Sequence, residues 1–320
     1  MRLTRRTFLA ATLASAALPA RAGSTRSLGG PAFGSYWRIT LPETADPAPV
    51  RAAIAAVVAG VDRLMSPYRA DTELGRFNTT ATTDLVPLSP ETARVTRAAL
   101  ALSAETGGAF DPTLGPIVAR YGFGPIAGGP GGAALLALEG DGLRKARADL
   151  TLDLCGIAKG HALDRTVAAL DGLGHAGFLL ELGGEVFARG AHPEGRPWQI
   201  GVEDTAGGVA HLATLSDTAA ATSGDTVQGY ALGRRRYGHI IDPKTGAPAS
   251  GSLASVTVFH PSAARADALA TALFAMGRER ALAFAEAQGL ETLMLAREGT
   301  RHHAIATGGA EGRLLGENRP

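Results

Sequence analysis

The sequence predicts an α+β protein, in which helices and strands are grouped along the chain instead of alternating. Two observations lead to this fold class. Helical patterns, with apolar residues at i, i+3, i+4 and i+7, stand apart from short strand-like segments. Between residues 198 and 259 several of these short segments follow one another with no helix between them. A doubly wound parallel sheet would require regular alternation, so α+β is favoured.

Residues 35–108 contain one predicted strand and two predicted helices. The segment "SYWRITL", residues 35–41, is typical of a strand. Pro49 is expected in the first turn of a helix. The apolar side of that helix consists of Ile54, Val57, Val58, Val61 and Leu64. A second helix is expected to begin after the cap Ser89, with Pro90 in its first turn, and to end at Gly107-Gly108.

The second half is richer in predicted strands. "ADLTLDL" (148–154) is interpreted as a strand, followed by a helix from about Lys159 and a strand at 177–184. "ATSGD" (221–225) is interpreted as a turn of small residues that brings the backbone close to a ligand. Short strands are expected near 198–202, 211–215, 237–241, 255–259, 292–296 and 302–307, with helices over 266–277 and 279–288.

The N-terminal segment predicts export from the cytoplasm. Arg5 and Arg6 precede Phe8, an apolar run over 10–18, and an A-x-A cleavage pattern at 20–22. We expect a twin-arginine signal over 1–22, with the export machinery as a partner, and a single domain over 23–320 that is soluble in the periplasm after cleavage. The apolar run is too short for a stable membrane span. An amphipathic N-terminal helix is the alternative.

Charge and cysteine content exclude several classes of protein. Removal of residues 1–22 lowers the number of Lys and Arg residues from 31 to 27 against 30 acids, a formal charge of −3. Such a chain has no electrostatic footprint for nucleic acid, and the run Arg234–Arg236 is interpreted as a solvated turn. The only cysteine, Cys155, excludes an internal disulfide and a cysteine-based zinc site.

An acid in an apolar helix is the most informative feature. In "ADALATALFAMG" (266–277) the apolar residues surround most of the helix, so it is expected to be buried. Asp267 and Thr271 lie four residues apart and therefore share one face. A buried carboxylate needs a partner. One carboxylate and one hydroxyl suit magnesium, which prefers oxygen ligands and keeps sites for water and phosphate. A helix cap or a hydrogen-bonded core aspartate is the alternative.

Four further motifs combine glycine with polar or aromatic residues. "DLCGIAKGHALD" (153–164) is a glycine turn entering a helix, which would bind an anion with help from Lys159, or simply form a tight turn. "GGAFDPTLGP" (107–116) places Phe110 and Asp111 where a ring could stack, or in a core turn. "ELGGEV" (181–186) is interpreted as a strand end. In "GHIIDPKTG" (238–246), His239 is a candidate general base or a hydrogen-bonded core residue.

Taken in order, these stretches resemble the ApbE family of FAD:protein FMN transferases, from about Phe33 to Thr307. The matching segments are "FGSYWRI", "LMSPYRADTELGRFN", "TGGAFDPTLGPIVARYGFG", "LDLCGIAKGHALD", "LELGGEVFARG", "WQIGVED", "ATSGD", "HIIDPKTG" and "SVTVFHPSAARADALATALFAMG". The resemblance implies an ApbE-like fold with mixed, largely antiparallel sheets, packed helices and a flavin cleft between two lobes. It also implies a Mg²⁺-dependent enzyme that cleaves its substrate FAD to AMP and attaches FMN through a phosphoester to a Thr or Ser of a periplasm-facing flavoprotein.

The resemblance also assigns residues by matched position. It implies that Mg²⁺ is bound by Asp267, Thr271 and the backbone carbonyl of Ala158, and that either His239 or Asp267 accepts the proton of the acceptor hydroxyl. FAD contacts are implied for Phe33, Tyr68, Ala109, Phe110, Asp111, Cys155, His161 and Ile241, with Lys159 as an additional phosphate ligand. The chain departs from the usual family pattern at Phe33–Ser35, Cys155, His161 and Gly238.

Alternative functions remain compatible with these residues. One is a periplasmic protein that binds or delivers FAD without catalysis. Another is a magnesium-dependent FAD pyrophosphatase, and a third is a structural factor for export or assembly that binds no flavin. Within the transferase interpretation, the export signal and "GGPAFGSYWRITLP" (29–42) are similar to accessory transferases of nitrous-oxide reduction. The acceptor would then be a membrane-bound redox flavoprotein.

Overall fold

The computed structural model describes residues 23–129, 131–203, 208–225, 229–233, 235–299 and 301–317, so the predicted export signal lies outside the described residues. The helices are α1 (Pro47–Met65), α2 (Glu73–Thr79), α3 (Pro90–Glu105), α4 (Gly115–Arg120), α5 (Cys155–Gly172), α6 (Ala263–Met276) and α7 (Arg278–Gln288). Among these helices none is both long and apolar enough to cross a membrane.

The strands belong to one large sheet and several small ones. The large sheet contains β1 (Thr25–Ala32), β2 (Ser35–Pro42), β6 (Phe178–Leu182), β7 (Glu185–Arg189), β10 (Thr218–Gly224), β15 (Leu253–His260), β16 (Glu291–Glu298) and β17 (Arg301–Thr307), adjacent in that order. Each neighbouring pair is antiparallel. The prediction of an α+β fold with largely antiparallel sheets is confirmed.

The small sheets are built from the remaining strands. One contains β8 (Trp198–Glu203), β9 (Val209–Leu215) and β18 (Leu314–Glu317), and another contains β3 (Val86–Pro87), β4 (Leu136–Glu139) and β5 (Gly142–Lys145). Two hairpins complete the set: β11 (Gly229–Leu232) with β12 (Arg235–Gly238), and β13 (Ile241–Asp242) with β14 (Ala247–Pro248).

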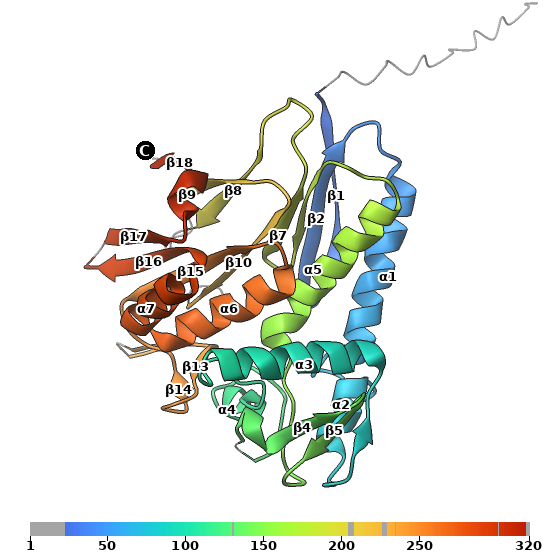
Figure 1. Ribbon diagram of the computed structural model, residues 1–320, viewed down its shortest axis with the longest axis vertical. Coiled ribbons are helices and arrows are strands. Elements are labelled where there is room, and N and C mark those ends of the chain that lie inside the picture. Colours follow the sequence, from blue (N-terminus) through green and yellow to red (C-terminus); the bar gives the residue numbers. More distant parts are fainter. Residues whose placement is uncertain are drawn as a thin grey trace, which may run out of the picture.

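The two faces of the large sheet are covered by different layers. On one, the helix face, α5 and α6 pack directly on the strands, and α1 lies beside α5 (Figure 1). Buried Ile39, Leu180 and Val256 belong to this core. On the opposite face, Phe259 packs with Trp198 of the β8–β9–β18 sheet in a second, smaller core. Because alternate residues of a strand point to opposite faces, β7, β10, β15 and β16 contribute buried residues to both cores.

Helix α6 is buried as its sequence predicts, because it packs on β10 and β15 of the sheet and on the neighbouring helix α5. Leu269, Leu273 and Met276 are buried. Its N-terminus is capped from α5, where the Asp164 carboxylate accepts hydrogen bonds from the amides of Ala263 (2.7 Å) and Ala264 (3.0 Å). Gly160 allows the two helices to touch, since a Cβ there would overlap the Ala263 carbonyl.

Two predicted elements are wrong. Residues 148–154 form no strand. They carry buried Leu150, Leu152 and Leu154 in an irregular segment, and the Asn78 amide replaces a neighbouring strand by donating to the Leu152 carbonyl (2.9 Å) and accepting from its N–H (2.8 Å). "ATSGD" is no turn, because its first four residues lie in β10, where small side chains let α6 pack closely.

The start of one predicted helix also moves. α5 begins at Cys155, ahead of the predicted start near Lys159, so the glycine turn of the sequence is the first turn of the helix. Ala158 and Lys159 therefore lie at the helix N-terminus, next to α6. This position is what brings the two predicted segments of the metal site together.

Candidate active site

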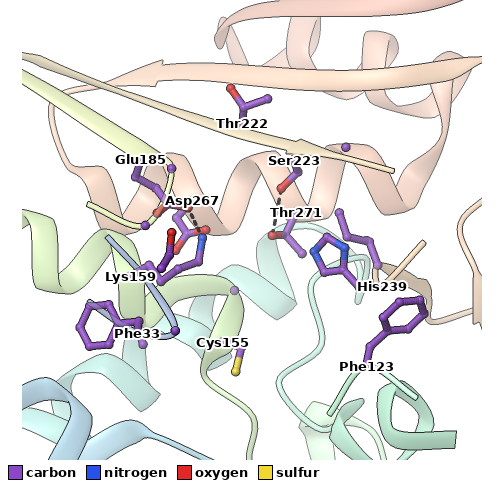
Figure 2. A pocket seen from close by; sticks show the side chains of 18 of the residues that line it. Phe33, Phe123, Cys155, Lys159, Glu185, Thr222, Ser223, His239, Asp267 and Thr271 are labelled. Atoms are coloured by element: carbon purple, nitrogen blue, oxygen red, sulfur yellow. Dashed lines mark hydrogen bonds and ion pairs between the residues drawn. The ribbon is translucent and has the colours of Figure 1, made fainter. Parts of the chain in front are cut away.

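One cavity of about 1270 Å³ opens where the N-terminus of α5, the middle of α6 and the ends of several strands meet. It is lined by most of the residues that the sequence assigned to a site. They are Phe33, Tyr68, Ala109, Phe110, Asp111, Cys155, Ala158, Lys159, His239, Ile241, Asp267 and Thr271. Figure 2 shows how lining residues of α5, α6, β7 and β10 surround this space, among them Cys155, Lys159, Glu185, Ser223, Asp267 and Thr271.

Asp267 is the buried acid at the centre of this cavity. Only 4% of the residue is exposed, and its Oδ2 accepts a hydrogen bond from the Gly160 amide at 3.1 Å. Among the described residues no hydrogen bond reaches Oδ1. Burial raises the pKa of the Asp267 carboxyl, while the Lys159 ammonium and the Gly160 hydrogen bond oppose that rise. The carboxylate therefore lies against the α5 N-terminus, facing the cavity.

Lys159 and Glu185 form an ion pair beside Asp267. Glu185 follows the glycine turn between β6 and β7 and is almost fully buried, whereas the Lys159 side chain is 37% exposed toward the cavity. Burial, together with the charge of Asp267, raises the pKa of Glu185 despite Lys159. The pKa of Lys159 is also raised, because the two carboxylates outweigh the effect of burial. Two acids thus share one cation.

Thr271 lies one helical turn beyond Asp267 on the same face of α6. Its hydroxyl is 3.3 Å from the Ser223 hydroxyl of β10 (Figure 2). Gly156, in the first turn of α5, is packed so closely that a Cβ would lie 3.4 Å from Thr271 Oγ1 and 3.0 Å from the Phe110 ring. The first turn of α5 therefore contacts both the predicted metal ligands and the predicted ring-binding segment.

The donor set fits a hard divalent cation. Among the described residues there is no group of three or more His, Cys, Asp and Glu that would hold a transition metal. Instead the site offers the Asp267 carboxylate, the Thr271 hydroxyl and the N-terminus of α5. Within the described part of the chain, Asp267 and Glu185 share a single cation, Lys159, so one of the two negative charges is not compensated. Magnesium binds through few protein oxygens and keeps positions for water and phosphate. These residues match that preference.

The rest of the lining is aromatic and small. Tyr68 is largely exposed at the rim, and its hydroxyl donates to the Phe123 carbonyl at 3.4 Å. The Asp111 carboxylate accepts from the Thr113 amide (2.9 Å) and hydroxyl (2.6 Å), which fixes the turn after Phe110. Burial, followed by the Asp153 charge, raises the pKa of the Cys155 thiol. Cys155 is therefore a neutral lining residue.

His161 is the exception among the predicted contacts. Its Nε2 lies 2.9 Å from Oε1 of Glu91 at the start of α3, and Arg165 donates to the same carboxylate. Burial lowers the pKa of His161, against the raising effect of Glu91. Because the ring points to the α3–α5 contact, His161 is absent from the cavity lining. The structure therefore does not bring His161 together with the other residues that were predicted to contact the flavin.

His239 lies on the other side of the cavity from Lys159 (Figure 2). It precedes β13, and its ring packs edge-on against Phe123 at 6.3 Å between centroids. Both residues line the cavity. The two bases expected from the sequence, His239 and Asp267, therefore line the same cavity.

The fold and cavity correspond to one protein family. A model of the ApbE family matches residues 33–294. The FAD:protein FMN transferase of Vibrio cholerae is 35% identical over 302 residues, covering 88% of this chain and 90% of that protein. The enzyme of the same name from Escherichia coli K12 is 31% identical over 295 residues, covering 85% and 84%. The chain belongs to the ApbE family.

Solved structures agree with this assignment. The flavin transferase ApbE from Vibrio cholerae superposes with a TM-score of 0.82 at 34% identity, covering 91% of this chain and all of that one. The apo form of the Pseudomonas stutzeri flavinyl transferase ApbE also gives 0.82, at 32% identity, covering 91% and 96%. The chain spans nearly the full length of these proteins.

Sequence reasoning did not assign two polar residues of the site. Glu185 was interpreted as part of a strand end, and Ser223 as part of a turn. A signal for Glu185 exists: an acid directly after Gly183-Gly184 opens a strand whose next three residues are apolar. No local signal identifies Ser223, because its role depends on the pairing of β10 with β15 beneath α6.

Proposed function

We propose that this member of the ApbE family is a magnesium-dependent FAD:protein FMN transferase. The oxygen of an acceptor Thr or Ser hydroxyl forms a bond to the FMN phosphorus of FAD, the bond from that phosphorus to the AMP oxygen breaks, and AMP leaves. The hydroxyl proton passes to a base of the enzyme. The name of the curated relatives supports the reaction, and the position of Asp267 supports the site.

The single observation that carries the metal proposal is the Asp267 carboxylate at the α5 N-terminus. It places Asp267, Thr271 and the backbone of Ala158 in one cavity, although they come from segments far apart in sequence. These three residues would hold Mg²⁺, which supplies positive charge against the charge that develops on the leaving AMP. Lys159, half-exposed beside them, would orient the pyrophosphate.

The other lining residues would position the flavin nucleotide. Phe33, Tyr68 and Phe110 offer aromatic surfaces, and the fixed Asp111 turn offers a hydrogen-bond acceptor. His239 and Asp267 both line the cavity, so either would accept the hydroxyl proton. A bound metal lowers the basicity of its carboxylate ligand, which favours His239 for this step.

We further propose that the enzyme acts outside the cytoplasm on a periplasm-facing flavoprotein. The sequence pattern of residues 1–22 supports export, and a membrane-bound redox protein is the acceptor that this location favours. Co-expression with candidate exported flavoproteins, followed by gel detection of covalent flavin fluorescence, would identify it.

The Asp267→Ala variant tests the catalytic proposal. With FAD, Mg²⁺ and the identified acceptor, the wild-type chain is expected to release AMP and to label the acceptor with FMN. Asp267→Ala should reduce both products by at least about 100-fold, the scale typical for loss of one charge-stabilising group. The matched control Asp141→Ala, an exposed acid of the β4–β5 turn, should leave both unchanged.

Three results would contradict the proposal. Full transfer by Asp267→Ala would remove the metal assignment. AMP and free FMN without acceptor labelling would indicate a pyrophosphatase, and tightly bound FAD without any turnover would indicate a carrier.

A further inference from the structure

The cavity continues into a groove on the opposite face of the large sheet, away from the helices. Its floor is formed by alternate residues of neighbouring strands: Tyr36, Arg38 and Thr40 of β2, with Leu179 and Glu181 of β6. The period of two shows that one face of the sheet is exposed there. Arg38 lies directly opposite Glu181 in the β2–β6 register, and the Tyr36 hydroxyl donates to Glu181 at 2.6 Å.

The wall of the groove has a different pattern. Five consecutive residues of β8, from Gln199 to Glu203, line the cavity. Side chains of consecutive strand residues point to opposite faces, so a continuous run means that β8 presents its edge. Within the described residues β8 pairs only with β9, which leaves the backbone N–H and C=O groups of its other edge unpaired. Such an edge is a template for an added strand.

The wall strand β8 and the floor strands β2 and β6 lie close enough for charges on one to affect groups on the other. The pKa of the Tyr36 hydroxyl is raised mainly by its hydrogen bond to Glu181 and by the charge of that carboxylate, with a further contribution from Glu203 of β8. The groove thus has a backbone edge on one side and polar side chains on the other.

The groove leads directly to the charged cluster. Gly183, in the turn between β6 and β7, donates its amide to the Tyr36 carbonyl at 2.9 Å, and a Cβ at Gly183 would lie 3.3 Å from Lys159 Cδ. The hydroxyl of Ser255, on β15, is buried, lines the same cavity and has no hydrogen-bond partner among the described residues. Such a hydroxyl has the capacity to bond a ligand or a water molecule in the cavity.

Space and position separate this groove from the flavin contacts. Pockets for small ligands usually measure roughly 300–1,000 Å³, so a cavity of about 1270 Å³ has room for more than one substrate. The residues proposed for FAD come from other segments: none belongs to β6 or β8, and Phe33 precedes β2. FAD also has no backbone with which to pair a strand edge.

We propose that this groove binds the acceptor protein, with an extended segment of the acceptor added as a strand to the free edge of β8. The inference rests on the proposed function, because it requires a polypeptide substrate. Main-chain hydrogen bonds to β8 supply affinity, and the floor residues contact every second side chain of the segment. The groove delivers the target hydroxyl past the Gly183–Gly184 turn to Lys159 and Asp267.

Variants of the floor test this proposal. Val186→Trp would fill the groove, since Val186 lines it next to Glu181, and Arg38→Glu would reverse an exposed floor charge without adding bulk. With the acceptor identified by co-expression, both should raise the acceptor KM by about 10-fold or more, as expected for loss of about 1.4 kcal/mol of binding. The FAD dissociation constant should stay within twofold. Arg280→Glu, an exposed reversal on α7, is the control.

A backbone test does not depend on any substitution in the enzyme. Peptides spanning the flavinylated residue of that acceptor would be N-methylated at single positions. Strand addition predicts that methylation at alternate positions blocks transfer while the intervening positions tolerate it, because only every second amide faces β8. Hydrogen exchange of the amides in 199–203 should slow when the unmethylated peptide binds.

The outcomes separate the two proposals. If the wild-type chain labels its acceptor and the groove variants keep the same acceptor KM, or if methylation acts without a period of two, the groove assignment is wrong and the transferase stands. If the variants weaken FAD instead, the groove belongs to the nucleotide. If no acceptor is labelled by the wild-type chain, the proposed function fails and this inference fails with it.

Discussion

Lys145 and Lys159 both leave bulk water, but they are stabilised in opposite ways. Lys145, on β5, is completely buried and donates to the backbone carbonyls of Phe77 (2.8 Å) and Thr80 (2.9 Å), with its ammonium 4.5 Å from the Phe77 ring centre. All of these partners are neutral. Lys159 instead pairs with one carboxylate, lies near a second and keeps part of its side chain exposed to the cavity.

The difference separates a structural cation from a functional one. Neutral carbonyls compensate only part of the cost of burying a charge, so burial lowers the pKa of Lys145. Its position at the C-terminal end of α2 joins that helix to the β3–β5–β4 sheet. The carboxylates around Lys159 raise its pKa, so it remains charged where a phosphate would bind. A lysine with acidic neighbours at a cavity is thus the candidate for catalysis, and a lysine capped by carbonyls is not.

Of the two lysines, the larger effect on transfer is expected for Lys159→Met. This variant leaves Glu185 and Asp267 close together without their cation, so Asp267 becomes a weaker metal ligand. FMN transfer at fixed Mg²⁺ should fall by about 10–100-fold, the range for losing a group that supports a metal ligand. Steady-state rates over a series of Mg²⁺ concentrations would measure the change, and raising Mg²⁺ should recover part of it. Lys159→Arg, which keeps the charge, should retain more activity than Lys159→Met.

A smaller effect, on stability and not on transfer, is expected for Lys145→Met. The Phe77 and Thr80 carbonyls would lose their donor inside the protein, at a cost of about 1–3 kcal/mol in the free energy of unfolding. Urea unfolding monitored by circular dichroism would measure it. The transfer rate of the folded protein should stay within twofold of wild type. A large loss of activity in Lys145→Met without a loss of stability would contradict the assignment of Lys145 to a purely structural role.

The smallest effect is a dependence on alkaline pH. Because the folded-state pKa of Lys145 is lowered, the unfolded chain binds more protons between that value and the ordinary lysine value of about 10.4. The free energy of unfolding of the wild type, relative to Lys145→Met, should therefore rise as pH increases through this window. Denaturation of both proteins at a series of pH values would test the sign. A falling difference would mean that Lys145 is stabilised as a cation.

Local patterns in the sequence were sufficient for the longer helices, but they did not predict the short helices α2 and α4 or every strand. α6 was predictable because its apolar residues surround it, and Ser89 and Pro90 marked the start of α3. The alternating leucines of 148–154 predicted a strand, yet the partner that an extended segment needs is the side chain of Asn78. Alternation shows that a segment is extended and half-buried; it does not show what it pairs with.

The same limit applies to the site. Asp267 and Thr271 were recognisable because an acid in an apolar helix requires a reason. The direction of the His161 ring could not be derived from the sequence, because it depends on Glu91, whose helix packs against α5 only in the folded chain. Glu185 had a local signal, the Gly183-Gly184 turn before it, that was interpreted only as a strand end. The β8 edge could not be derived from local sequence, since it depends on how strands pair. The β4–β5 hairpin was missed although Gly140-Asp141 forms its two-residue turn.

The hydrogen bond from Gly160 to Asp267 joins residues 107 positions apart. The proposed binding of Mg²⁺ would therefore require a chain in which α5 and α6 have already packed together. Partly folded chains, or chains cleaved between α5 and α6 before they fold, would contain the same residues but would not bind the ion. Titration with a paramagnetic ion such as Mn²⁺ would then count completed molecules in a preparation, before any flavin or acceptor is added.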